Sequence, residues 1–183
     1  MTYDRALLNE LVSLRFLEAH AHVAIVGHFG VGKTFLAHAL GHIACRRGAS
    51  VRAVRADQML KTLQHARLDR TYEAEMRKLL AVELLIVDDF GLDAMEPTES
   101  RDAYEILTER HRLGSMIVTS NRGPDEWLAT FADPMRAQSS IDTLHQQLLR
   151  PGHRGRVVPA TAQAQTRVST TGDRIGEVPP VTR

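Results

Sequence analysis

The stretch GHFGVGKT, residues 27–34, decides the fold, and it follows directly on the apolar run VAIV, residues 23–26. The stretch fits the pattern G-x-x-x-x-G-K-[ST], in which glycines allow backbone N–H groups to close around phosphate groups. A strand before such a loop and a helix after it are the setting in which the pattern binds a nucleotide. The sequence therefore predicts a phosphate-binding loop, with a purely structural glycine turn as the alternative.

The residues of this loop have different expected roles. Lys33 is expected to reach the β- and γ-phosphates of ATP, and the Thr34 hydroxyl is expected to hold Mg²⁺. The helix that starts here adds free N–H groups and the positive end of its dipole. The full set predicted to bind the nucleotide is Gly27, Gly30, Val31, Gly32, Lys33, Thr34 and Phe35.

Polar side chains also end two later apolar runs. Asp88 and Asp89 close the run LLIVDD, and Asn121 follows the run SMIVT at residues 115–119. We predict that Asp88 joins Thr34 in holding Mg²⁺, directly or through water, and that Asp89 orients or deprotonates the attacking water. Asn121 is predicted as a second catalytic residue that fixes this water against the γ-phosphate. The alternatives are a solvated strand end for the two aspartates and a turn or helix cap for Asn121.

Short apolar runs alternate with amphipathic helical segments along the chain. This alternation predicts an α/β fold with a parallel sheet covered by helices on both faces. An amphipathic stretch with leucines at helical spacing precedes the first strand, and Asp4 is its expected N-cap. Strands are predicted at residues 23–26, 51–54, 84–89 and 115–119, and helices at 33–47, from 57 onward, at 73–81 and at 98–112.

Composition narrows the class of protein. A chain of 183 residues with 43% hydrophobic residues is long and apolar enough for one globular domain with a core. The formal net charge of +1 does not by itself indicate a nucleic-acid partner. The lone Cys45 excludes an internal disulfide and fits a reducing cytoplasm. Since no apolar run approaches the roughly 20 residues of a membrane helix, no membrane association is expected.

Five stretches together resemble the IstB-like ATP-binding proteins, which are helper ATPases of bacterial insertion-sequence transposition related to the DnaC helicase loaders. The resemblance extends from about Asp4 to Asp142 and implies a P-loop NTPase core of the AAA+ type. It also implies ATP and Mg²⁺ as cofactors, assembly into a homo-oligomer on DNA, and a transposase as partner. It assigns phosphate and Mg²⁺ contacts to Lys33 and Thr34. The stretches are GVGKT, LLIVDDFGL, GSMIVTSNRGPDEW, FADP and AQSSID.

The sequence departs from the family at both ends of this region. We expect the helical region that usually precedes the core in this family to be missing, and Thr143 stands where the family usually has an arginine that could serve a neighbouring subunit's ATP. ATP hydrolysis is expected from the family but could therefore be impaired. Two alternatives to a transposition helper remain open: a degenerate, hydrolysis-deficient fragment of such a protein, and a DnaC-like helicase loader.

The sequence pattern divides the chain into a core at residues 1–142 and a divergent tail at 143–183, which we expect to be disordered. A frameshift is one explanation of the tail, because codons for residues 143–167 can be chosen whose neighbouring frame reads RFTSNSYDLVIEGESYRPRLKPRL, similar to the family's ending. A genuine divergent linker is the other explanation. Either way, the core is expected to lack its last strand, which would leave residues 23–26 at an exposed edge.

Overall fold

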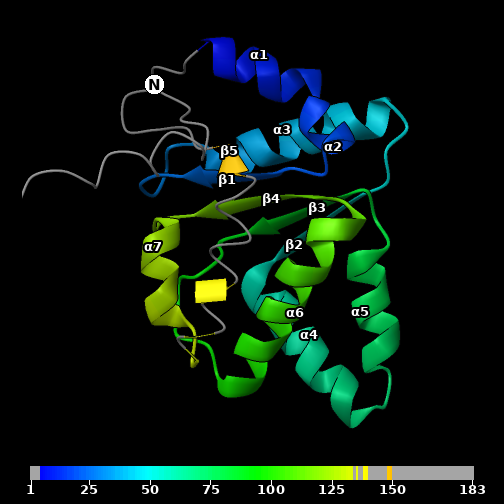
Figure 1. Cartoon of the computed structure of the whole chain (residues 1–183), viewed down its shortest axis with the longest axis vertical. Coiled ribbons are helices and arrows are strands. Elements are labelled where there is room, and N and C mark those ends of the chain that lie inside the picture. Colours follow the sequence, from blue (N-terminus) through cyan, green and yellow to red (C-terminus); the bar gives the residue numbers. More distant parts are fainter. Residues whose placement is uncertain (1–4, 134, 136–137, 140–147, 150–183) are drawn as a thin grey trace, which may run out of the picture.

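A parallel sheet crosses the centre of the chain, with helices above and below it (Figure 1). The computed structural model describes residues 5–133, 135, 138–139 and 148–149. In these residues the strand order is β2-β3-β4-β1-β5, and each pair of neighbours is parallel. The strands are β1 (His22–Val26), β2 (Val51–Arg55), β3 (Leu84–Asp88), β4 (Ser115–Ser120) and β5 (Leu148–Leu149).

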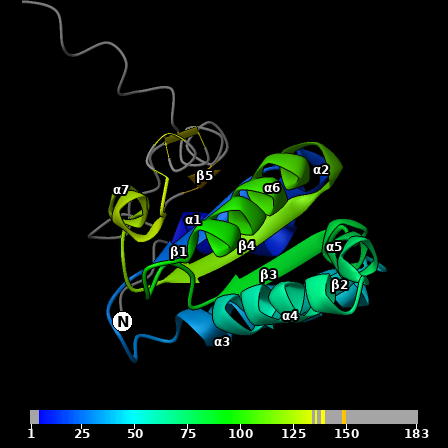
Figure 2. The ribbon, with the colours of Figure 1, turned by 90° about the horizontal axis from the view of Figure 1, so that it is seen from below.

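The helices cover both faces of the sheet, so the predicted α/β fold class is confirmed. In the two views, α1, α2 and α3 lie on one face, and α4, α5 and α6 lie on the other (Figures 1 and 2). Of the helices described, none is both long and apolar enough to cross a membrane. Their bounds are α1 (Arg5–Ser13), α2 (Arg15–Glu18), α3 (Lys33–Arg46), α4 (Ala56–Leu68), α5 (Tyr72–Leu80), α6 (Pro97–Leu113), α7 (Pro124–Trp127) and the 3₁₀ turn Leu128–Thr130.

Two hydrophobic cores fix the sheet between its helices, because neighbouring side chains on a strand point to opposite faces. On β1, Val23 and Ile25 pack with α1, α2 and α3, whereas Ala24 packs toward α4, α5 and α6. Leu85 and Ile86 divide between the two cores in the same way on β3. Each fully buried aliphatic side chain of this kind contributes about 1.5–3 kcal/mol to folding. The central strands are therefore a rigid support for whatever lies at their ends.

The predicted N-terminal helix is interrupted. The structure breaks it between α1 and α2 at Leu14, whose φ is 59°, in the left-handed region. The Ser13 hydroxyl donates to the Glu10 carbonyl at 2.6 Å and accepts from the Arg15 N–H at 3.4 Å. Such local bonds compete with the helical pattern, which explains why leucine spacing alone predicted a longer helix. Asp4, the expected N-cap, lies outside the described residues.

The last strand is short but present, which corrects the expectation that the sheet lacks it. Leu148 and Leu149 form β5, which lies parallel to β1 opposite His22 and Val23. Most of the predicted tail, including Thr143, lies outside the described residues. The position beside the phosphate-loop strand is therefore occupied over two residues at the start of β1.

Candidate functional site

The phosphate loop begins where β1 ends and carries two glycines with left-handed backbone. Gly30 has φ 79° and Gly32 has φ 84°, values that side chains other than glycine rarely adopt. Gly32 is the N-cap of α3, and the first helical hydrogen bond runs from the Leu36 N–H to the Gly32 carbonyl at 3.0 Å. The N–H groups of residues 33–35 precede that bond and face out of the helix end, where they can bind an anion.

Lys33 lies at the centre of the site and is only 8% exposed. Its ammonium donates to the His28 carbonyl at 2.9 Å, within the loop, and to Asn121 Oδ1 at 2.6 Å, just beyond β4. The lysine thus links the phosphate loop to Asn121, the residue that was predicted to fix the attacking water. The Asn121 side chain therefore lies beside Lys33, as its predicted role requires.

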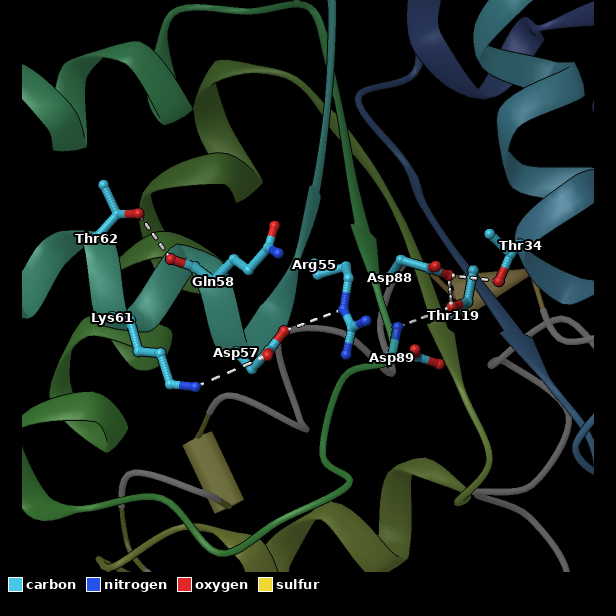
Figure 3. A network of polar contacts seen from close by, with 9 residues as sticks. All are labelled: Thr34, Arg55, Asp57, Gln58, Lys61, Thr62, Asp88, Asp89 and Thr119. Atoms are coloured by element: carbon cyan, nitrogen blue, oxygen red, sulfur yellow. Dashed lines mark hydrogen bonds and ion pairs between the residues drawn. The ribbon is translucent and has the colours of Figure 1, made fainter.

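Asp88 ends β3 beside the start of α3 (Figure 3), and the residue is only 8% exposed. Its Oδ1 accepts a hydrogen bond from the Thr34 hydroxyl at 3.0 Å and another from the Thr119 hydroxyl. Because the Asp88 carboxylate is buried and accepts two hydrogen bonds, it is not a solvated strand end. Threonine hydroxyl and aspartate carboxylate are hard oxygen donors of the kind that Mg²⁺ prefers, so these residues fit the metal that the loop pattern implies.

Asp89 follows with its backbone in the left-handed region, at φ 57°. Its N–H donates to Thr119 Oγ1 at 3.0 Å, and its side chain is partly buried. Asp89 also borders a cavity of about 260 Å³ whose other walls come from the end of β2, from α4, from the segment after β3 and from α6, including Arg55, Lys61 and Met95. The phosphate loop does not line this cavity.

The parallel register explains why these residues meet. Val26 lies opposite Ser120, and Val87 lies opposite Val118, so β1, β3 and β4 end at the same edge of the sheet. Ligands of open α/β sheets bind outside the carboxyl ends of the strands, which is where the loop, Asp88 and Asn121 gather.

Phe35 and Gly27, two of the residues predicted to bind the nucleotide, have no side-chain group directed at it. The Phe35 side chain is 80% exposed, so only its backbone N–H is directed toward the helix end. Gly27 lies close to Val31, because a Cβ on the glycine would stand 3.2 Å from Val31 Cγ2. The Gly27 N–H bonds the Ser120 carbonyl at 3.2 Å and ties the loop to β4. Gly27 therefore shapes the loop and Phe35 offers only its backbone, whereas Lys33 and Thr34 present functional groups.

Sequence reasoning missed Thr119, which supports the site, and its buried neighbour Ser120, whose hydroxyl bonds outside the site. Thr119 bonds both aspartates, as described above. Ser120 donates to the Phe90 carbonyl at 2.6 Å and accepts from Trp127 Nε1 at 3.0 Å. Two consecutive hydroxyl residues at the end of a buried strand were the only signal, because hydroxyls buried in a core need partners. Trp127 itself is fully buried and belongs to the core.

Comparison with known proteins agrees with this geometry. Residues 1–157 match the family described as IstB-like ATP binding protein. The chain belongs to this family. An insertion-sequence ATP-binding protein of Mycobacterium tuberculosis is 37% identical over 160 residues, which cover 84% of this chain and 64% of the relative. One from Sinorhizobium fredii is 39% identical over 142 residues, covering 78% of this chain and 57% of the relative.

The chain therefore spans between half and two-thirds of the length of these relatives. Among solved structures, the DnaC helicase loader superposes with a TM-score of 0.63 at 20% sequence identity, covering 81% of this chain and 92% of the loader. At this identity the likeness concerns the fold, which is that of AAA+ P-loop NTPases. The resemblance expected from the sequence is confirmed.

Proposed function

We propose that this IstB-like chain binds ATP with Mg²⁺ and hydrolyses it while assisting a transposase in insertion-sequence transposition. The observation that carries the proposal is the bonded set formed by Lys33, Asn121, Thr34 and Asp88 at one edge of the sheet. A cation, a sensor amide, a hydroxyl and a carboxylate at the end of a phosphate loop are the groups that phosphoryl transfer from a nucleotide requires.

In this proposal, each side chain has a stated task. Lys33 and the N–H groups at the start of α3 hold the phosphates, and Thr34 with Asp88 holds Mg²⁺. Mg²⁺ would neutralise charge on the phosphate oxygens. Asp89 receives a proton from the attacking water or orients it, and Asn121 fixes that water. When a nucleotide binds, the Lys33 ammonium would leave Asn121 and bond a phosphate oxygen. Nucleotide binding would thereby be coupled to Asn121, just beyond the end of β4.

The proposed partners are a transposase, DNA and further copies of the chain. The names of the relatives place them in insertion sequences, and moving such a sequence requires a transposase acting on DNA. A protein with these partners would work in the bacterial cytoplasm. The helicase-loader alternative has the same site chemistry and a different protein partner, so it predicts capture of a replicative helicase rather than a transposase.

The test is ATP turnover of the purified chain, measured as phosphate release with and without duplex DNA. We expect turnover that rises with DNA, falls to background in Lys33→Ala, and is unchanged in Lys78→Ala. Lys78 is a matched control because it is an exposed lysine that pairs with Glu75 on α5. Asp89→Asn should bind ATP but not hydrolyse it.

Bound ATP without turnover in the wild type would support the hydrolysis-deficient alternative instead. Turnover that persists in Lys33→Ala would remove the proposed site. The frameshift explanation of residues 143–183 has its own test, which is DNA sequencing across the codons for residues 141–167.

A further inference from the structure

Thr119 is fully buried, yet its hydroxyl lies at the junction of the two aspartates (Figure 3). Its Oγ1 bonds Asp88 Oδ1 and also accepts the Asp89 N–H at 3.0 Å. Its backbone carbonyl accepts the next amide, Phe90 N–H, at 2.9 Å. One threonine of β4 therefore holds three consecutive residues at the exit of β3.

The direction of these bonds follows from the chemistry of the groups. A hydroxyl has one proton to donate and lone pairs to accept with. Because an ionised carboxylate only accepts and a backbone N–H only donates, the Thr119 proton must go to Asp88 and its lone pair must face Asp89. Both functions of the hydroxyl are used, and a side chain without a hydroxyl would replace neither.

The bond to Asp89 also acts on its backbone. Asp89 has φ 57°, a left-handed conformation that L-residues adopt infrequently and that needs support from its surroundings. The Asp89 N–H bond to Thr119 supplies such support. The orientation of the Asp89 side chain relative to the backbone of β3 therefore depends on Thr119.

The Asp88 carboxylate is fixed from two sides. Thr34 from α3 and Thr119 from β4 donate to the same oxygen, Oδ1. Thr34 must also face the metal in the proposed function, but the buried Thr119 has no such second task. Groups that bond a metal-holding side chain from behind fix its orientation, and their removal typically lowers metal affinity or activity by about 10–100-fold.

We propose that Thr119 is a positioning residue for the acidic pair: it orients the Asp88 carboxylate for Mg²⁺ and fixes the Asp89 backbone for its role toward water. The proposal rests on the proposed ATP–Mg²⁺ function. It predicts that Thr119 governs the contribution of Mg²⁺ to nucleotide binding, and not the contribution of the phosphate loop.

The test compares binding of a non-hydrolysable ATP analogue in EDTA and in saturating MgCl₂, by calorimetry, for wild type, Thr119→Val and Thr119→Ser. We expect Thr119→Val to bind as the wild type does in EDTA and to lose at least about tenfold of the gain in affinity that Mg²⁺ gives. Thr119→Ser keeps the hydroxyl and should restore that gain. Thr119→Ala is a second hydroxyl-free variant in case valine prevents folding.

Ser120→Ala is the matched control. Ser120 is the next residue on β4, equally buried, but its hydroxyl bonds Phe90 and Trp127 instead of the aspartates. It should lower the melting temperature without changing the Mg²⁺ gain. If the hydroxyl-free variants keep the full gain, or if Ser120→Ala loses it equally, the positioning role is wrong. If the wild type binds no nucleotide under either condition, the proposed function fails and this proposal fails with it.

Discussion

His22 should make the stability of this protein depend on pH between about 6.5 and 4. The residue begins β1 and is fully buried, and its Nδ1 accepts a hydrogen bond from the Met116 N–H at 3.1 Å. Burial, followed by the positive charges of Arg110, His111 and His20, lowers the pKa of His22 from 6.5 to about 4. The native state therefore disfavours the protonated imidazole.

The sign follows from proton binding in the two states. Below pH 6.5 the unfolded chain takes up a proton on His22 and the folded chain does not, so the free energy of unfolding decreases as the pH falls. The loss approaches its limit near pH 4, where the folded protein also binds the proton. A pKa of about 4 against 6.5 corresponds to roughly 3 kcal/mol in total.

Urea unfolding at several pH values between 7.5 and 4 measures this loss. His22→Asn is the informative variant, because an asparagine Oδ1 can accept the Met116 N–H and cannot be protonated in this range. His65→Asn, which replaces an exposed histidine of α4, is the control. We expect the stability of wild type minus His22→Asn to fall by about 3 kcal/mol across the range. Parallel curves for the two proteins would refute the reasoning, whatever their separation.

Three further predictions concern the core. Asp102→Ala should lower the free energy of unfolding, measured by urea titration, by about 3 kcal/mol. The reason is that the fully buried Asp102 carboxylate accepts hydrogen bonds from Arg67 on both oxygens and another from Tyr72. A decrease below about 0.5 kcal/mol would contradict this account. Gly114→Ala should destabilise by about 2 kcal/mol or more in the same assay, because its Cβ would meet the Glu83 carbonyl oxygen at 2.8 Å. The lone Trp127 should emit at short wavelength and resist iodide quenching, since it is fully buried; emission like that of exposed tryptophan would place α7 elsewhere.

The sequence predicted the sheet well where short apolar runs end at glycines or carboxylates. The run before the phosphate loop and the run that ends in two aspartates became β1 and β3 within a residue or two. The predicted helix ends differ from the observed ones, because helix ends depend on local hydrogen bonds. Helix α6 begins at Pro97 with a capping box between Glu96 and Glu99, one residue before the predicted start.

The candidate site could be predicted in its parts but not in its connections. The phosphate loop is a contiguous motif, so spacing alone located Lys33 and Thr34. Thr119 became visible only with the parallel register, because its partners come from a strand about 30 residues earlier in the chain. The same applies to the bond between Lys33 and Asn121, which joins residues 88 positions apart.

The central claim is that the loop at residues 27–34 binds ATP through Lys33. Calorimetric titration of ATP with Mg²⁺ into wild type, Lys33→Ala and Lys78→Ala tests it most directly. We predict saturable binding at one site per chain in the wild type and in Lys78→Ala. Lys33→Ala should bind at least about tenfold more weakly, since a hydrogen bond to a charged group contributes roughly 1.5–3 kcal/mol. Equal affinity in Lys33→Ala, with its fold intact, would contradict the account.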